Sequence, residues 1–165
     1  MAGGGRYYVR KVRAGILVVV IGLVLSGCGQ QPAFYAAHSY NCCTENTGNL
    51  TWHAGQSVAL HWQSTPAAMT TDSTPHTIVL SVSLTGPFAT VDALKQATTQ
   101  GLKPAGVRTI NAAPVSVNDR TFLTPVSQLD LPADLLPGYY NLAQEAAQGR
   151  GSAVGGAIVI VAPSP

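Results

Sequence analysis

After residue 45 the chain contains several short runs in which apolar and polar residues alternate. Residues 56–63 and 76–85 show the alternation most clearly. A period of two over this length predicts β-strands with one buried face. Their predicted inward residues are Val58, Leu60, Trp62, Ile78, Leu80, Val82 and Leu84. A shorter strand is predicted over residues 49–53, with Leu50 and Trp52 on one face and a turn at Ala54-Gly55.

Turn-forming residues separate these runs and divide the rest of the chain. Gly86-Pro87 is predicted to end the second long strand, and weaker strands are predicted over residues 106–110, 114–117 and 121–126. Residues 64–75 form a polar loop, and Gly149–Gly156 is predicted to be a flexible hairpin loop. The final run, AIVIV over residues 157–161, is continuously apolar and predicts a central, buried strand.

One segment departs from the period of two. Residues 90–100, TVDALKQATTQ, predict a helix of two or three turns. Thr90 can cap the first free N–H groups, Asp92 lies favourably in the first turn, and Gly101 can close the end. Val91, Leu94 and either Ala97 or Thr98 supply its buried stripe, so we expect a crossover helix packed against an edge or end of a sheet.

Tyr140 stands near the start of a predicted strand, after the turn at Pro137-Gly138 and two residues before Leu142. This arrangement resembles the tyrosine corner of immunoglobulin-like sandwiches, in which the phenol bonds backbone a few residues upstream. The resemblance implies a mainly β fold, a single immunoglobulin-like antiparallel β-sandwich with one short crossover helix. The Cys…Trp…Cys pattern of antibody domains is absent, which leaves a fibronectin-III-like or related bacterial sandwich.

The N-terminus has a different pattern. Four basic residues, Arg6, Arg10, Lys11 and Arg13, precede an uncharged apolar run from Ala14 to Leu25. As a helix the run would reach about 18 Å, whereas a membrane span needs about 30 Å. A basic start followed by a short apolar run and small residues is typical of a secretory signal. The body of the protein is therefore expected outside the cytoplasm.

The run ends in Leu25-Ser26-Gly27-Cys28, which resembles the lipobox of bacterial lipoproteins. The resemblance implies that a diacylglycerol is attached to the Cys28 thiol and that cleavage leaves Cys28 as the first mature residue. It divides the chain into a signal peptide (1–27), a lipidated cysteine and tether with a Cys-Cys pair (28–44), and a β-sandwich domain (45–165). The alternative is an uncleaved signal anchor in which Cys28 is incidental.

Removal of residues 1–27 changes the charge balance. The remaining 138 residues hold five basic and seven acidic side chains, a net charge of −2. No basic patch remains that could neutralise several phosphates, so nucleic acid is excluded as a partner.

Two adjacent cysteines, Cys42 and Cys43, remain after Cys28. They can form a vicinal disulfide, remain as thiols in a loop, bridge to another chain, or serve a redox or metal site, with His38 nearby. His53 and His61 are expected to face solvent on strands, and the histidines lack metal-ligand spacing.

No catalytic motif is present. The sequence has no G-x-S-x-G, no H-E-x-x-H and no phosphate loop, and Pro132 separates Asp130 from Asp134. We therefore expect no enzyme and no cofactor, but a lipid-anchored protein on the extracytoplasmic face of the cell membrane. It would bind a protein or glycan of the envelope, through the loops at residues 64–75 and 149–156, or have a structural role. The alternatives are a redox or metal protein using Cys42 and Cys43, and an accessory subunit of an envelope enzyme or transporter.

Overall fold

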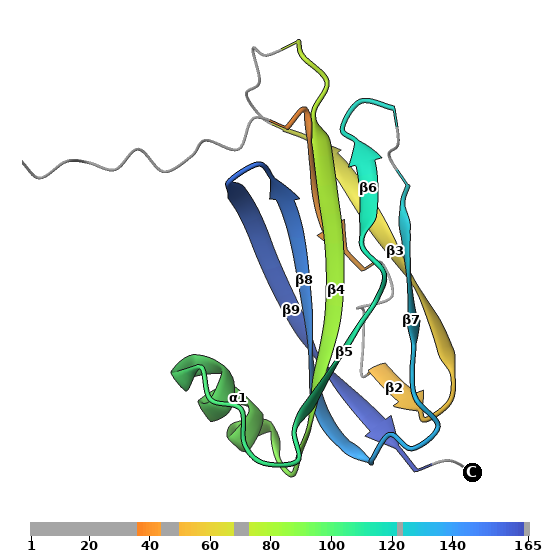
Figure 1. Ribbon diagram of the computed structural model, residues 1–165, viewed down its shortest axis with the longest axis vertical. Coiled ribbons are helices and arrows are strands. Elements are labelled where there is room, and N and C mark those ends of the chain that lie inside the picture. Colours follow the sequence, from red (N-terminus) through yellow and green to blue (C-terminus); the bar gives the residue numbers. More distant parts are fainter. Residues whose placement is uncertain (1–35, 44–49, 68–72, 122–123, 164–165) are drawn as a thin grey trace, which may run out of the picture.

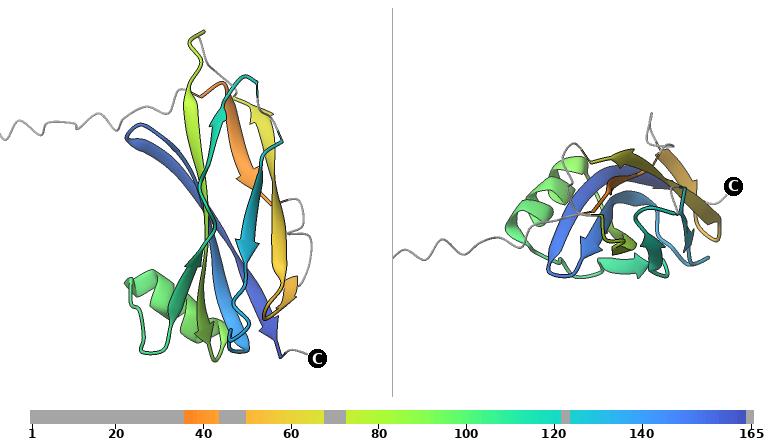
Figure 2. Two further views of the ribbon diagram at one scale, coloured as in Figure 1. Left: turned by 45° about the vertical axis from the view of Figure 1, so that its right-hand side comes forward. Right: turned by 90° about the horizontal axis from the view of Figure 1, so that it is seen from above.

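The domain consists of two facing β-sheets and one short helix (Figures 1 and 2). The computed structural model describes residues 36–43, 50–67, 73–121 and 124–163. The predicted signal peptide and Cys28 lie outside these residues. No helix within the described ranges combines the length and apolar character needed to cross a bilayer.

The smaller sheet has three strands and the larger has six. In the smaller sheet the order is β1 (His38–Cys42), β3 (Ser57–Pro66), β7 (Val126–Asp130). In the larger sheet the order is β2 (Leu50–His53), β9 (Gly151–Ala162), β8 (Gly138–Gln148), β4 (Thr77–Phe88), β5 (Arg108–Asn111). The remaining strand, β6 (Val115–Asn118), pairs with the first part of β4. β2 and β9 run parallel, and the other pairs are antiparallel.

The core lies between the two sheets and uses the predicted inward faces. Ile78, Leu80 and Leu84 are fully buried on β4, and Leu60 and Trp62 are buried on β3. Burial of a side chain of this size contributes about 1.5–3 kcal/mol. The two long alternating runs of the sequence are therefore confirmed as strands with one buried face.

The helix, α1 (Val91–Gln100), is also confirmed, but it is not a crossover, because it joins β4 to β5, which pair antiparallel in the same sheet. The Thr90 hydroxyl accepts from the Ala93 N–H at 3.1 Å, and Gly101 ends the helix in the left-handed region at φ 63°. Leu94 and Ala97 form its buried stripe and pack with Phe88 and partly buried Tyr139. Because these contacts lie at the end of β4, α1 covers only one end of the larger sheet (Figure 1).

The prediction of a strand over residues 121–126 is wrong. Strand β7 instead begins at Val126 and runs to Asp130, pairing with β3. One of its two inward positions is occupied by Ser127, which is fully buried and accepts a hydrogen bond from Trp62 Nε1 at 2.9 Å. A buried serine at an inward position removes the apolar alternation by which the strand could have been recognised.

Two predicted strand limits are also wrong. β4 does not end at Gly86-Pro87 but continues to Phe88, with a shift in its register to β8 after Thr85. Gly86 permits this because a Cβ there would lie 2.5 Å from the Tyr140 ring. Only Gly149 and Arg150 form the predicted hairpin loop, because Gly151 already pairs with Gln148 as the first residue of β9.

The last strand is only partly as predicted. Over residues 159–161 β9 lies between β2 and β8, so it is central there. Val159 and Val161 are buried, whereas Ile158 is 36% exposed. The continuous apolar run therefore has one buried face rather than two.

The domain begins before residue 45. Ala36, Tyr40, Cys42 and Cys43 belong to the main core, and β1 pairs with β3 from His38↔Pro66 to Cys42↔Trp62. The sequence places these residues in the predicted tether, residues 28–44, because residues 36–43 lack a clear apolar period.

The buried Asp119 links three segments at the end of the domain where residue 36 lies. Its Oδ2 accepts from the Ala37 N–H at 2.6 Å and its Oδ1 from the His76 N–H at 2.9 Å. The Asp119 backbone N–H also donates to the His76 carbonyl, and its carbonyl lies 2.6 Å from His38 Nδ1. Asp119 thus joins the starts of β1 and β4 to the end of β6.

We predict that Asp119→Ala lowers the free energy of unfolding by about 2–5 kcal/mol. The substitution leaves the buried N–H of Ala37 and the partly buried N–H of His76 without an acceptor, and each such group costs about 1–3 kcal/mol. Asp119→Asn should lose less, because its amide oxygen still accepts one bond. Urea denaturation followed by tryptophan fluorescence measures both. Gln96→Ala, at an exposed position inside α1, is the control and should stay within about 0.5 kcal/mol of the native chain; an equal loss in the control would contradict the role of Asp119.

Candidate functional site

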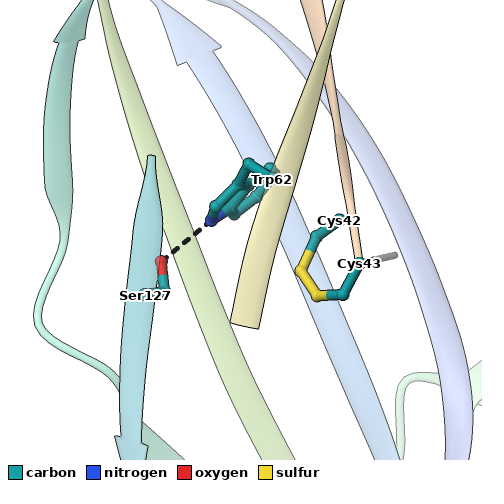
Figure 3. Close-up of a disulfide and its surroundings, with 4 residues drawn as sticks. All are labelled: Cys42, Cys43, Trp62 and Ser127. Carbon is teal, nitrogen blue, oxygen red and sulfur yellow. Dashed lines mark hydrogen bonds between the residues drawn. A yellow bond between two sulfur atoms is a disulfide. The ribbon is translucent and has the colours of Figure 1, made fainter. Parts of the chain in front are cut away.

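The residues singled out in the sequence lie in separate parts of the structure. Cys42 and Cys43 are joined by a disulfide at the end of β1, where the chain leaves the smaller sheet (Figure 3). Cys42 is 7% exposed and Cys43 8% exposed, and Cys42 pairs in register with Trp62. Both cysteines therefore belong to the core between the two sheets.

Tyr140 is fully buried near the start of β8. Its hydroxyl donates to the Leu136 carbonyl at 2.7 Å, four residues upstream. Burial raises the pKa of the Tyr140 hydroxyl, and the positive charge of Arg108 opposes part of that rise. The phenol therefore remains a hydrogen-bond donor over the physiological range, and it fixes the turn that leads into β8.

The histidines and aspartates do not form a reactive cluster. His53 and His61 are exposed on strands, as expected, and His53 Nδ1 lies 3.1 Å from the Pro163 carbonyl. Arg108 makes two hydrogen bonds to the Asp134 carboxylate, at 3.0 and 3.1 Å, and holds the pKa of Asp134 below its usual value. Within the described ranges no group of three or more His, Cys, Asp or Glu side chains is placed to hold a metal ion.

A hollow of about 340 Å³ lies on the outer face of the larger sheet, beyond the part that α1 covers. Its floor forms because two small residues stand side by side: Ser83 of β4 pairs with Ala143 of β8. The next row holds Ser81, Glu145 and Val154. Asn111, the last residue of β5, and Pro114, between β5 and β6, border the hollow on the other side.

The polar side chains of this hollow are not used inside the protein. Among the residues that the structure describes, Ser81, Ser83, Asn111 and Glu145 have no side-chain hydrogen bond or ion pair. Together they offer two hydroxyls, an amide and one carboxylate. Sequence analysis predicted that Ser81 and Ser83 point outward. It could not place them beside Glu145 and Asn111, because that depends on the register of four strands.

The outer face of the smaller sheet is different. There the Ser39 hydroxyl bonds Thr65 at 2.8 Å, and Ser57 bonds both Asp130 and Gln128. A larger hollow of about 510 Å³ is lined on this face by His61, Gln63 and Thr65, of which His61 and Thr65 already have partners. The hollow on the larger sheet is the better candidate for a binding site because it contains a carboxylate, Glu145, whereas none of the described residues that line the larger hollow is Asp, Glu, Lys or Arg.

Comparison with known proteins gives a likeness of fold alone. No protein-family model matches the chain, and no curated protein matches it. Its structure is similar to part of a family 123 glycoside hydrolase from Clostridium perfringens, which was studied for glycolipid glycan hydrolysis. The match has a TM-score of 0.44 and 11% sequence identity, and covers 78% of this chain. It spans 28% of the hydrolase, so the chain corresponds to a minor part of that protein.

We predict that Tyr140→Phe lowers the free energy of unfolding by about 0.5–1.5 kcal/mol. The phenylalanine ring keeps the packing, whereas the Leu136 carbonyl loses its donor. Chemical denaturation measures the difference. Tyr139→Phe is the matched control, since the Tyr139 hydroxyl has no hydrogen bond to any described residue. Equal effects of the two substitutions would show that the Tyr140 hydroxyl does not hold the turn.

Proposed function

We propose that this chain is a lipid-anchored, non-enzymatic binding module on the extracytoplasmic face of the cell membrane. The observation that carries the binding role is the hollow of unused polar groups on the larger sheet. The anchor rests on the sequence around Cys28.

The position of the first described residues limits where such an anchor can hold the domain. Ala36 is buried at the end that Asp119 holds. Seven residues lie between it and Cys28, and the eight Cα–Cα steps, at about 3.5 Å each, reach at most about 28 Å. A domain anchored through Cys28 would therefore keep this end near the bilayer. The predicted contact loop at residues 64–75 leads from the same end, since Ala67 bonds Ala37, so we place the binding surface on the sheet face instead.

The chemistry of the hollow favours a polypeptide ligand over a glycan. Trp52 and Trp62 are 6% and 3% exposed, so neither presents an open ring on which a sugar could stack. The hollow offers hydroxyl and amide groups beside the exposed apolar side chain of Val154. This mixture suits main-chain amides and short side chains, and Glu145 suits a cationic group of the partner.

The burial of the disulfide supports a structural role rather than a redox role. Thiol–disulfide exchange requires a thiolate to reach one sulfur atom, and both cysteine side chains are less than 9% exposed. The disulfide instead stiffens the point where the chain leaves β1.

We also infer that the sandwich is immunoglobulin-like. In support, the first strand is divided between the sheets, with β1 on β3 and β2 parallel to β9. The order β9-β8-β4-β5 opposite β3-β7 corresponds to the G-F-C-C′ and B-E strands of variable-type domains. The hydrogen bond of Tyr140 to a backbone carbonyl upstream adds to this agreement.

The anchor is tested by mass spectrometry of the protein from its native membrane fraction. We expect an intact mass that begins at Cys28 with an added diacylglycerol, because two acyl chains anchor a soluble domain stably. Cys28→Ser should retain residues 1–27 and carry no lipid. A full-length, unmodified mass for the native chain would contradict the anchor.

The binding surface is tested by a photo-crosslinking side chain at position 83, in the hollow, and by the same group at Gln128, on the outer face of the smaller sheet. We expect adducts with a defined polypeptide only from position 83, reduced at least fivefold by Glu145→Lys because the charge is reversed. Equal adducts from both faces, or none from position 83, would rule out the hollow as the binding surface.

A further inference from the structure

The first part of β9 forms an open sheet edge. β2 pairs with β9 only from Val159 to Ala162, and within the described ranges no strand pairs with residues 151–156 on that side. Ser152 to Gly156 are all exposed, and Val154 is 78% exposed, the highest value among the exposed large apolar side chains. Figure 2 shows this end of the β8–β9 hairpin standing apart from the other strands.

The unused backbone groups of this edge can be assigned. The two-residue turn Gly149-Arg150 places Gln148 opposite Gly151, which is the hydrogen-bonded pair that closes such a turn. Hydrogen-bonded residues alternate along an antiparallel strand. The backbone N–H and C=O groups of Ser152, Val154 and Gly156 therefore point away from β8, toward the open edge.

Nothing in β9 protects this edge. Proteins usually shorten edge strands or place charged residues or proline in them. The other edge strands of this domain have four or five residues, whereas the part of β9 that β2 leaves unpaired has eight, residues 151–158, with no charged residue and no proline. An uncharged edge of this length is a site for addition of another strand.

We propose that the open edge of β9 pairs antiparallel with the same edge of a second copy of this chain, with Val154 opposite Val154 on the two-fold axis. This register places Ser152 opposite Gly156 and Ala153 opposite Gly155. The small residues let the backbones approach without a clash, no like charges meet, and the two exposed valines cover each other.

The position of the first described residues favours a second copy of this chain as the partner of the open edge. Ser152 pairs with Ala147, and Ala147 with Val79, close to the start of β4, which Asp119 ties to Ala37. Antiparallel pairing through this part of β9 would therefore place Ala37 of each copy near the middle of the dimer. The predicted tethers of the two copies would then start close together. Two tethers could then reach one membrane; this step rests on the proposed anchor, whereas the edge itself does not.

The pairing would also join two binding surfaces. Val154 borders the hollow on the larger sheet, so the hollows of the two copies would meet across β9. The result is one trough with a Glu145 on each side, suited to an extended polypeptide longer than one domain could hold. Bivalent contact of this kind raises the overall affinity without any new contact in either hollow.

The pairing is tested by cysteine crosslinking of Val154→Cys in the full chain, in membranes, with a mild oxidant. Residues directly opposite in a hydrogen-bonded antiparallel pair have Cα atoms about 5.5 Å apart, within the range for a disulfide. We expect most of the protein to become a covalent dimer that reductant reverses. Ser116→Cys, exposed on β6 at the opposite side of the sheet, and the native chain are the controls and should give less than a tenth of that yield. No dimer from position 154, or equal yields from 154 and 116, would overturn the proposal.

A second measurement does not depend on a new cysteine. Light scattering of the detergent-solubilised native chain should give a dimer, and Val154→Lys a monomer with an unchanged circular dichroism spectrum, because two like charges would then meet on the axis. A native monomer, or a Val154→Lys dimer, contradicts the pairing. The Cys28→Ser chain separates this outcome from failure of the anchor, since its edge is intact and it should still dimerise at high concentration.

Discussion

The two sheets depend on one buried carboxylate at the end where the chain enters the domain. A carboxylate removed from water is costly unless hydrogen-bond donors surround it. Asp119 satisfies this condition with the backbone N–H groups of residues 37 and 76, which belong to segments far apart in the chain. Since those segments lead into β1 and β4, one side chain sets the position of a strand in each sheet.

With the strands fixed in this way, the two outer faces of the sandwich acquire different properties. On the smaller sheet polar side chains are long enough, and close enough, to bond each other. On the larger sheet the small side chains of Ser83 and Ala143 leave a hollow in which the polar groups do not reach one another. Small residues also flank Val154 at the open edge of β9. The features that we assign to binding and to pairing therefore both depend on small side chains.

The fold was predictable wherever burial followed a period. The inward faces of β3 and β4 and the stripe of α1 could be identified because apolar residues repeat at two or at three to four residues. Strand β7 could not, since Ser127 occupies an inward position and its role depends on Trp62 of another strand. Strand β1 was mistaken for tether for a similar reason: its burial depends on pairing with β3 and on Asp119, which lies more than eighty residues away.

The candidate site was less predictable than the fold. The outward direction of Ser81 and Ser83 follows from the alternation, and Tyr140 was recognisable from the turn before it. The hollow itself depends on which rows of four strands coincide, and the open edge depends on where β2 stops. Neither is encoded in a local pattern.

The division of the first strand between the sheets has a mechanical consequence. β1 lies along the long axis of the domain and is held to β3 by five paired residues, from His38 to Cys42. A pull on residue 36 directed away from the far end of the sandwich would act along this strand. The β1–β3 hydrogen bonds would then be loaded in shear, all together, rather than opened one after another from the end. A domain tethered at this point would resist traction between its membrane and its partner better than one held through a strand that could be peeled away.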